Sequence, residues 1–301
     1  MRKIRVLLCQ PMPTESSPQK NPPLGIMFAG AAAEKQGFEV DYWDERWDSS
    51  ELLESLIKES DIVGVSSFTG IQLRYARQIF ARAKKHRKIT LLGGIHANLT
   101  SDQCLQDELV DYVAVGEGEV TLPSFLKFYS KEIAQPFGIK GPGIKYVSAP
   151  MVPGTDFISP ITKKTFRFFS LANQTNDVML PSSRGCPYSC GFCVNSTIKN
   201  SKYRVIDADV WLSWLDELLL QVPIKWLQVG DDYLGNQNRI LRIGRQLHER
   251  GIQWNPSCRA DNFKKNGEEF AFELKRLGVT DISIGVETGS ARLMEFINKG
   301  E

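Results

Sequence analysis

The sequence predicts an α/β protein with two parts, a doubly wound parallel sheet followed by a partial (β/α) barrel. In the first 130 residues, short apolar runs alternate with amphipathic helical segments, a pattern typical of doubly wound sheets. From residue 177 onward the alternation resumes, and each strand candidate runs into polar residues or cysteines, as the strands of barrel enzymes do. We therefore expect domains over 1–135 and 177–301, joined by a connection over 136–176.

The first domain contains five strand candidates and the helices that connect them. Apolar runs predict strands over 4–9, 39–43, 61–66, 89–92 and 111–115. Helical spacing of apolar residues predicts helices over 25–36, 51–59 and 122–129. It also predicts a helix that carries Ala76, Ile79, Phe80 and Ala83 and has a basic end over 82–88. Gly37 follows the first helix, where a left-handed glycine commonly ends a helix.

Small residues gather where the third, fourth and fifth strands end. They are Ser66, Ser67, Gly93, Gly94, Gly116 and Gly118, together with Glu117. Ligands of doubly wound sheets bind beyond the carboxyl ends of the strands, and glycine lets a ligand approach the backbone. These residues predict a ligand-binding edge, with tight turns as the alternative. A dinucleotide is disfavoured, because the loop after the first strand, Gln10 to Pro13, contains no glycine.

Residues 131–176 are rich in proline and glycine and show little periodicity, which predicts a connection. Within it we expect a small hairpin that pairs residues 144–147 with 165–169.

The second domain contains four strand candidates, over 177–181, 225–229, 252–258 and 281–286. Between them, Asp207 is a candidate N-cap for a helix with a buried tryptophan stripe, and Gly251 and Gly278 end the next two helices. The strand ends carry cysteines, Gly230-Asp231-Asp232, Arg259 and Glu287. Because a closed barrel takes about eight strands, we expect a barrel that is partial and truncated at its C-terminus.

The cysteines at the first of these strand ends are Cys186, Cys190 and Cys193, with the spacing C-x3-C-x2-C. Structural zinc and an all-cysteine four-iron cluster each take four protein ligands. Three thiolates on a four-iron cluster leave one iron open, so a small molecule can bind there. The alternative is a zinc site completed by a remote histidine such as His248.

The composition is that of a soluble globular protein, with 42% hydrophobic residues, 24% charged residues and a net charge of +2. No segment approaches the roughly 20 apolar residues of a membrane span, and no signal-peptide core is present. We expect a cytoplasmic protein with neither membrane nor nucleic-acid partners. In a reducing compartment the six cysteines favour metal binding over disulfides, and Cys9, Cys104 and Cys258 are expected to be buried.

The cysteine loop, with Phe192 directly before its last cysteine, resembles the cluster motif of the radical SAM superfamily. The resemblance implies that Cys186, Cys190 and Cys193 hold a [4Fe-4S] cluster whose open iron binds S-adenosylmethionine (SAM). An electron from the cluster would cleave SAM to a 5′-deoxyadenosyl radical. An electron donor such as flavodoxin or ferredoxin is then implied, and no catalytic residue beyond the cluster ligands is assigned.

The same resemblance implies SAM contacts from the loop and the strand ends. The expected contacts are Phe192, Gly230, Asp231, Asp232, Arg259 and Glu287. Gly230-Asp231-Asp232 departs from the Gly-Gly-Glu motif of the family, so either carboxylate is a candidate for the SAM amino group. A structural salt bridge is the alternative for Arg259 and Glu287.

The N-terminal half resembles the flavodoxin-like cobalamin-binding domain of one subgroup of the superfamily. The resemblance lies in Pro22 to Gly25, Asp61 to Ser66, Gly93 to Ala97 and Gly116 to Glu119. It implies that cobalamin is bound by Ser66, Ser67, Gly93, Gly94, Gly116, Glu117 and Gly118. Some of these domains supply a histidine to cobalt from Asp-x-His-x-x-Gly after the first strand, but residues 10–23 contain no histidine. We expect base-off cobalamin without a histidine ligand. For His96 we expect either a turn-stabilising role or a role behind the residues that contact the ligand directly.

Together the resemblances imply an enzyme that uses a [4Fe-4S] cluster, SAM and cobalamin. The simplest activity is methyl transfer from methylcobalamin to an unactivated carbon or phosphorus atom of a small-molecule substrate. One alternative is a cobalamin-associated radical SAM cyclase or rearrangement enzyme. Another is a non-catalytic metal- or cobalamin-binding module with a structural zinc loop.

Overall fold

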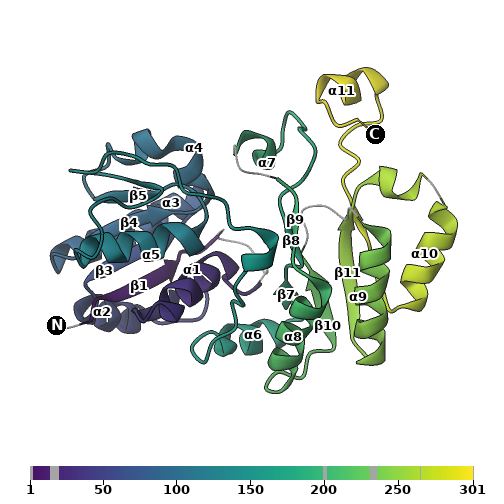
Figure 1. The fold of residues 1–301 in the computed structure, drawn as a ribbon, viewed down its shortest axis with the longest axis horizontal. Coiled ribbons are helices and arrows are strands. Elements are labelled where there is room, and N and C mark those ends of the chain that lie inside the picture. The colour runs from purple at the N-terminus through teal and green to yellow at the C-terminus, as the bar shows by residue number, and fades with distance from the viewer. Residues whose placement is uncertain (1–2, 14–19, 199–201, 231–235, 265, 301) are drawn as a thin grey trace. The chain divides into compact units, whose positions relative to one another are not determined.

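The computed structural model describes residues 3–13, 20–198, 202–230, 236–264 and 266–300. The chain divides into two compact units, drawn in Figure 1. Unit 1 comprises Met1–Gln19, Pro23–Val152 and Ile158–Thr165, and unit 2 comprises Lys20–Pro22, Pro153–Phe157 and Phe166–Glu301. The predicted connection over 136–176 is therefore shared between the two units.

Unit 1 contains a six-stranded sheet in the order β2-β1-β3-β4-β5-β6. The strands are β1 (Arg5–Gln10), β2 (Glu39–Asp44), β3 (Ile62–Ser66), β4 (Ile89–Gly93), β5 (Tyr112–Ala114) and β6 (Ile139–Lys140). The first five strands are parallel, and β6 pairs antiparallel with β5. Val6 to Cys9 are all buried, because both faces of a parallel sheet are covered. The predicted doubly wound sheet is confirmed.

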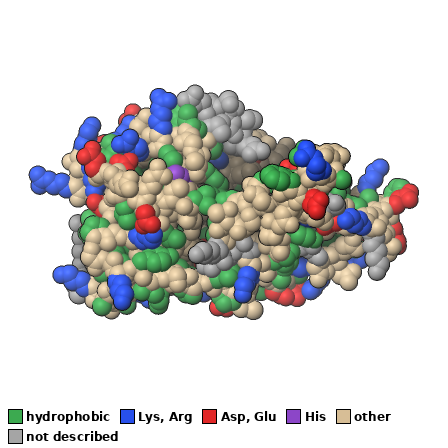
Figure 2. All heavy atoms as spheres, turned by 90° about the horizontal axis from the view of Figure 1, so that it is seen from above, with side chains coloured by type: hydrophobic (Ala, Val, Ile, Leu, Met, Phe, Trp, Pro, Cys, Tyr) green, Lys and Arg blue, Asp and Glu red, His purple; other side chains and the backbone are tan. Residues whose placement is uncertain are grey.

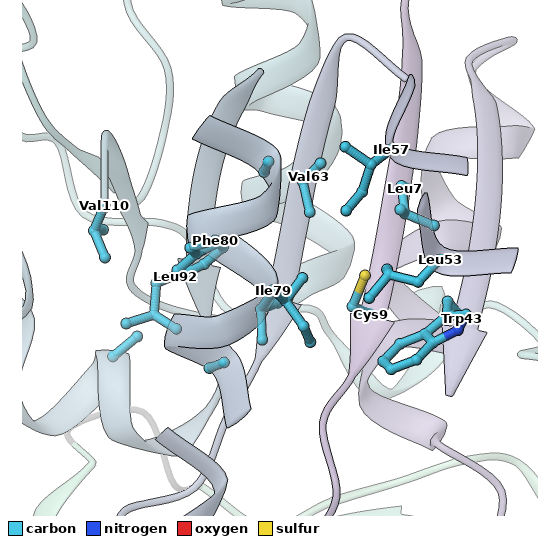
Figure 3. Packing of buried hydrophobic residues seen from close by; sticks show 14 of the residues in the cluster. Leu7, Cys9, Trp43, Leu53, Ile57, Val63, Ile79, Phe80, Leu92 and Val110 are labelled. Carbon is cyan, nitrogen blue, oxygen red and sulfur yellow. The ribbon is translucent and has the colours of Figure 1, made fainter. Parts of the chain in front are cut away.

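Five helices connect and cover these strands. They are α1 (Leu24–Lys35), α2 (Ser50–Glu59), α3 (Ile71–Lys85), α4 (Ile95–Cys104) and α5 (Gly118–Tyr129). Figure 3 shows one core of the unit, in which Leu7 and Val63 of the sheet lie near Ile57 of α2 and Phe80 of α3. Helix α5 packs closely on α1, because a Cβ on Gly118 would lie 2.7 Å from the Cβ of Ala29.

Helix α4, strand β6 and helix α6 differ from the sequence prediction. Helix α4 was not predicted, because it buries only Ala97 and Cys104 and so has little apolar periodicity. The predicted hairpin over 144–147 and 165–169 is wrong: Ile139–Lys140 pairs with β5 instead. Residues Phe166–Asn173 form helix α6, whose buried Phe168, Phe169 and Ala172 lie on one helical face.

Unit 2 contains a parallel sheet in which each strand pairs with the next along the chain, in the order β12-β11-β10-β7. The strands are β7 (Met179–Leu180), β10 (Trp226–Val229), β11 (Gln253–Cys258) and β12 (Ser283–Ile284). The long helices between them are α8 (Ala208–Leu219), α9 (Gln237–Glu249) and α10 (Gly267–Arg276). Sequential parallel pairing with intervening helices is the pattern of a (β/α) barrel, so the predicted partial barrel is confirmed.

Shorter elements lie around this sheet. They are η1 (Gly154–Asp156), β8 (Ser183–Arg184), α7 (Val194–Thr197), β9 (Arg204–Val205), η2 (Ala260–Phe263) and α11 (Ala291–Phe296). The Asp207 side chain accepts hydrogen bonds from the N–H groups of Asp209 and Val210 and so caps α8, as predicted. Gly251 and Gly278 follow α9 and α10 with φ of 66° and 90°, which confirms their helix-ending role.

Charged side chains of both signs are scattered over the face drawn in Figure 2. Within the described ranges, no helix is both long and apolar enough to span a bilayer. Cys9, Cys104 and Cys258 are free and buried, as expected from their sequence context.

Candidate functional site

The cysteine loop of unit 2 follows β8 and precedes β9, which pairs antiparallel with β8 (Figure 1). Its last turn is folded by its own residues: the Cys193 N–H donates to Cys190 O at 3.1 Å. The Ser196 hydroxyl donates to the carbonyls of Cys190 and Cys193 at 2.9 and 2.7 Å. Cys190 is buried, with 7% of its surface exposed, while Cys186 and Cys193 are half-buried.

The loop is also held by residues from the far end of the chain, directly after α11. The Gly191 N–H donates to Ile297 O at 2.8 Å. The Asn298 side-chain amide donates to the carbonyl and the hydroxyl of Ser189, both at 3.0 Å. These contacts fix the middle of the loop. Ile297 and Asn298 could not be predicted from the sequence, because both lie outside the cysteine motif.

Arg259, directly after β11, contacts two side chains of the loop, Tyr188 and Cys190. Its guanidinium lies over the Tyr188 ring, 3.6 Å from the centroid. Nη1 donates to Cys190 Sγ at 3.7 Å, Nη2 to Lys299 O at 2.6 Å, and Nε to both oxygens of Asp261 at 3.2 Å. Tyr188 OH donates to Asp261 as well, at 3.1 Å. The guanidinium is thus oriented by a ring, a carboxylate and a carbonyl.

Glu287, the second charged residue expected at SAM, lies opposite Lys299. The Lys299 ammonium donates to the Glu287 carboxylate at 3.1 Å and to Gly285 O at 2.5 Å. Lys299 is 5% exposed, and Glu287 has a left-handed backbone with φ of 58°. Arg259 and Glu287 therefore both contact Lys299, and their role as SAM contacts stays a prediction.

The other expected SAM contacts are distributed differently. Phe192 is 53% exposed on the cysteine loop. At Gly230 a Cβ would lie 2.8 Å from Met179 Cγ and Sδ, which explains a glycine at the end of β10. Asp231 and Asp232 lie outside the described residues.

The Cys186 thiol is affected by its burial and by the charges around it. Burial raises the pKa of Cys186, and negative charge on Cys193 and Cys190 raises it further, while a hydrogen bond from the Tyr188 backbone and the Arg259 charge lower it. In the part of the chain that the structure describes, no three His, Cys, Asp or Glu side chains form a group placed to hold a metal ion. The three thiols thus lie on one loop, but their sulfur atoms are not arranged as a set of metal ligands. Three soft sulfur donors nevertheless fit an iron–sulfur cluster in their chemistry.

In unit 1 the loops after β3 and β4 are joined at the carboxyl edge of the sheet. The Ser67 N–H donates to Gly93 O, and the His96 N–H donates to Ser67 O, both at 3.1 Å. Gly94 has φ of 90°, and a Cβ there would lie 2.6 Å from Ser67 N and 2.9 Å from Ser66 Oγ. Only glycine fits such a close approach with a positive φ.

Asn98 extends this edge to the loop after β5. Its side-chain amide donates to Gly94 O at 2.9 Å, and its carbonyl oxygen accepts from the Gly116 N–H at 2.7 Å. The Glu117 carboxylate accepts from the Val152 N–H at 2.7 Å, and Gly118 packs on α1 as described above. The edge therefore brings the predicted serines and glycines together, and their contacts to cobalamin stay predictions.

Gln72 and Phe68 were not singled out from the sequence. Gln72 is 1% exposed; its Oε1 accepts from the Phe68 N–H at 2.6 Å, and its Nε2 donates to Pro11 O at 2.9 Å. Gln72 thereby ties the loop after β1 to the loop after β3 and holds Phe68, which is 56% exposed. A glutamine in the first turn of an amphipathic helix gives no sign of such burial.

His96 lies at the same edge, with a hydrogen-bond partner on each ring nitrogen. Thr69 Oγ1 is 2.9 Å from Nδ1, and Thr100 Oγ1 is 3.1 Å from Nε2. Burial lowers the pKa of His96. This geometry supports the predicted turn-stabilising role.

Two family models match this chain, one mainly in unit 1 and one within unit 2. Residues 13–126 match the model of the B12 binding domain, and residues 180–301 match the model of the radical SAM superfamily. The second match includes the cysteine loop, and the first includes the serines and glycines of the sheet edge.

Three similar proteins cover most of this chain. An uncharacterized methyltransferase of Pyrococcus horikoshii is 26% identical over 321 residues, covering 100% of this chain and 69% of the relative. Bacteriochlorophyllide d C-12(1)-methyltransferase of Chlorobaculum tepidum is 24% identical over 285 residues, covering 92% and 58%. The solved structure of OxsB, a cobalamin-dependent S-adenosylmethionine radical enzyme with aqua-cobalamin and S-adenosylmethionine bound, shares the fold. It aligns with a TM-score of 0.84 at 21% identity and covers 99% of this chain and 46% of that one. The chain thus spans between about half and two thirds of the length of these proteins.

Proposed function

We propose that this chain, which belongs to the radical SAM proteins that carry a B12-binding domain, transfers a methyl group to a small molecule. The acceptor would be an unactivated carbon or phosphorus atom. The observation that carries the proposal is the combination, in one chain, of a three-thiol loop on a partial barrel and a glycine-rich edge on a doubly wound sheet. The similar proteins that are named methyltransferases support it.

In this proposal Cys186, Cys190 and Cys193 hold a [4Fe-4S] cluster as thiolates. When bound, the cluster supplies the electron that cleaves SAM, and cobalamin supplies the methyl group. Burial raises the pKa of the Cys186 thiol, so the thiol keeps its proton until a bound metal stabilises the thiolate. Cys190, buried beside Arg259, is shielded from water, which protects that sulfur from competing ligands.

Cobalamin is proposed to bind at the unit 1 edge, in the base-off form and without a histidine ligand. Residues 10–23 contain no histidine, and both ring nitrogens of His96 are occupied by threonines. Ser66, Ser67 and the glycines of the edge would contact the cofactor through backbone and hydroxyl groups. Phe68, exposed on a loop that Gln72 fixes, would add an apolar contact to the corrin ring.

A labelled-SAM experiment tests the proposal without knowledge of the substrate. The protein is reconstituted anaerobically with iron, sulfide and cobalamin, then given SAM with a deuterated methyl group and a reductant. We expect 5′-deoxyadenosine, and label on the extracted corrinoid. Cys190→Ser should abolish the 5′-deoxyadenosine, whereas Cys104→Ser in unit 1 should leave it unchanged.

The alternatives predict other results in the same assay. A cyclase or rearrangement enzyme would form 5′-deoxyadenosine without labelling the corrinoid. A non-catalytic module would bind zinc in place of iron and cleave no SAM, which would overturn the proposal. An electron donor such as flavodoxin or ferredoxin is proposed to replace the chemical reductant in the cell.

A further inference from the structure

The contact between Arg259 and Cys190 places a permanent positive charge beside one of the three thiols. The two side chains come from residues 69 positions apart, and Nη1 lies 3.7 Å from Sγ in a buried environment. Arg259 is 9% exposed and Cys190 is 7% exposed. At this burial, solvent screens the charge only weakly, so the interaction is stronger than it would be at the surface.

The remaining contacts of Arg259 hold the guanidinium in one orientation. Stacking on Tyr188 fixes its plane, while Asp261 and Lys299 O accept from the Nε and Nη2 groups. With these groups engaged, Nη1 is the donor that faces the sulfur. A fixed donor costs little further ordering when it forms a hydrogen bond, in contrast to a flexible lysine.

Hydrogen bonds and charges near the sulfur ligands set the reduction potential of an iron–sulfur cluster. Reduction adds one negative charge to the cluster, so a nearby positive donor favours the reduced state. We propose that Arg259 is a positioning residue for Cys190 that also raises the reduction potential of the cluster. This inference rests on the proposed function, because it requires a cluster at the three cysteines.

Asp261 provides an internal comparison of opposite sign. Its carboxylate accepts from Arg259 Nε and from Tyr188 OH, so its negative charge lies in the same cluster of side chains. The negative charge of Asp261 lowers the reduction potential of the cluster, whereas the positive charge of Arg259 raises it. Replacing either residue breaks the same ion pair, but the two replacements change the local charge in opposite directions.

The test is an EPR-monitored redox titration of the reconstituted full chain without SAM. Arg259→Gln should lower the ratio of reduced to oxidised cluster at a fixed solution potential by about threefold to tenfold, a shift of roughly 30 to 60 mV for a one-electron couple. Asp261→Asn should raise that ratio. Arg259→Lys should restore part of the wild-type value, since it keeps the charge. Arg250→Gln, which breaks the ion pair with Asp216 on α8, is the control and should leave the ratio unchanged.

Shifts of the same sign in Arg259→Gln and Asp261→Asn would mean that both variants merely loosen the loop, and would overturn the inference. An unchanged ratio in Arg259→Gln would overturn it too. If Arg259→Gln retains no cluster, the Asp261→Asn variant decides between the outcomes. A raised ratio of reduced to oxidised cluster supports the inference, and a lowered or unchanged ratio overturns it. Absence of any cluster in the wild-type chain would instead refute the proposed function, so the two failures are distinguishable.

Discussion

The two candidate sites are held in place in different ways. At the edge of unit 1, the hydrogen bonds join loops of one sheet: they span 4 positions from Phe68 to Gln72, 18 from Gly116 to Asn98 and 61 from Gln72 to Pro11. The cysteine loop of unit 2 depends on partners 69 positions away at Arg259 and 109 away at Asn298. The first site forms with its sheet, whereas the second requires the chain after β12 to fold back on the loop.

The thiols show the consequence of this difference. The serines and glycines of unit 1 are already joined by hydrogen bonds, while the three cysteines share a loop without forming a metal-holding group in the described residues. Metal binding commonly supplies the free energy that orders its own ligands. We therefore expect the unit 1 edge to be preformed and the three thiols to be brought into position by their cluster.

The largest effect should come from filling the preformed edge. Gly94→Ala puts a Cβ 2.6 Å from Ser67 N at a φ of 90°, so it combines a clash with backbone strain. We expect the free energy of unfolding of unit 1 to fall by about 2–4 kcal/mol, with loss of cobalamin binding, measured by urea denaturation and by corrinoid retention.

Gly37→Ala is the matched control for that variant. Gly37 has a similar φ of 89° but nothing within 4 Å of its Cβ, so only strain of about 1 kcal/mol is expected. Equal destabilisation by the two variants would show that the close approach at Gly94 contributes nothing.

The next effect tests the buried glutamine at the same edge. Gln72→Met keeps the volume but leaves the Phe68 N–H and the Pro11 carbonyl without their side-chain partner, at a cost of about 1–3 kcal/mol. Cobalamin affinity, measured by absorbance titration, should fall as well. Gln78→Met, at an exposed position of the same helix, should change neither stability nor cobalamin affinity. A similar loss in both variants would contradict the role of Gln72 in joining the two loops.

A smaller effect is expected where unit 2 closes on the cysteine loop. Asn298→Ala removes two hydrogen bonds to Ser189 that are exposed, so global stability should change by only about 0.5 kcal/mol. The rate at which a chelator removes iron should nevertheless rise severalfold, because the loop loses an anchor. Arg292→Ala, at an exposed position of α11, serves as the control. Equal rates in the two variants would contradict the dependence on distant residues.

The smallest effect concerns pH. Burial lowers the pKa of His96 in the folded chain, so the unfolded chain binds a proton more readily. Stability from this group is fully present above the unfolded pKa of about 6.5 and is lost as the pH falls below that value toward the lower pKa of the folded chain. Denaturant titrations at pH 7.5 and 5.5 should show a smaller pH dependence for His96→Gln than for the wild type. An unchanged pH dependence would show that His96 does not contribute to the pH dependence of stability.

The difference between local contacts and contacts to distant residues also explains which features could be predicted from the sequence. Strands, helix-ending glycines and the Asp207 cap follow from local patterns, and the structure confirms them. The cysteine spacing and the glycines after β3, β4 and β5 also stand in local sequence. Helix α4 and the hydrogen bonds of Gln72 were missed, because a polar residue shows its burial only in the fold. The contacts of Tyr188, Asn298 and Lys299 were missed because their partners lie 12 to 109 positions away along the chain.

The most direct test of the central claim is the metal content of the chain after anaerobic reconstitution. We predict about four irons and four acid-labile sulfides per chain, and a marked loss of both in Cys190→Ala. A chain that holds zinc without iron, or a Cys190→Ala variant with undiminished iron, would contradict the account.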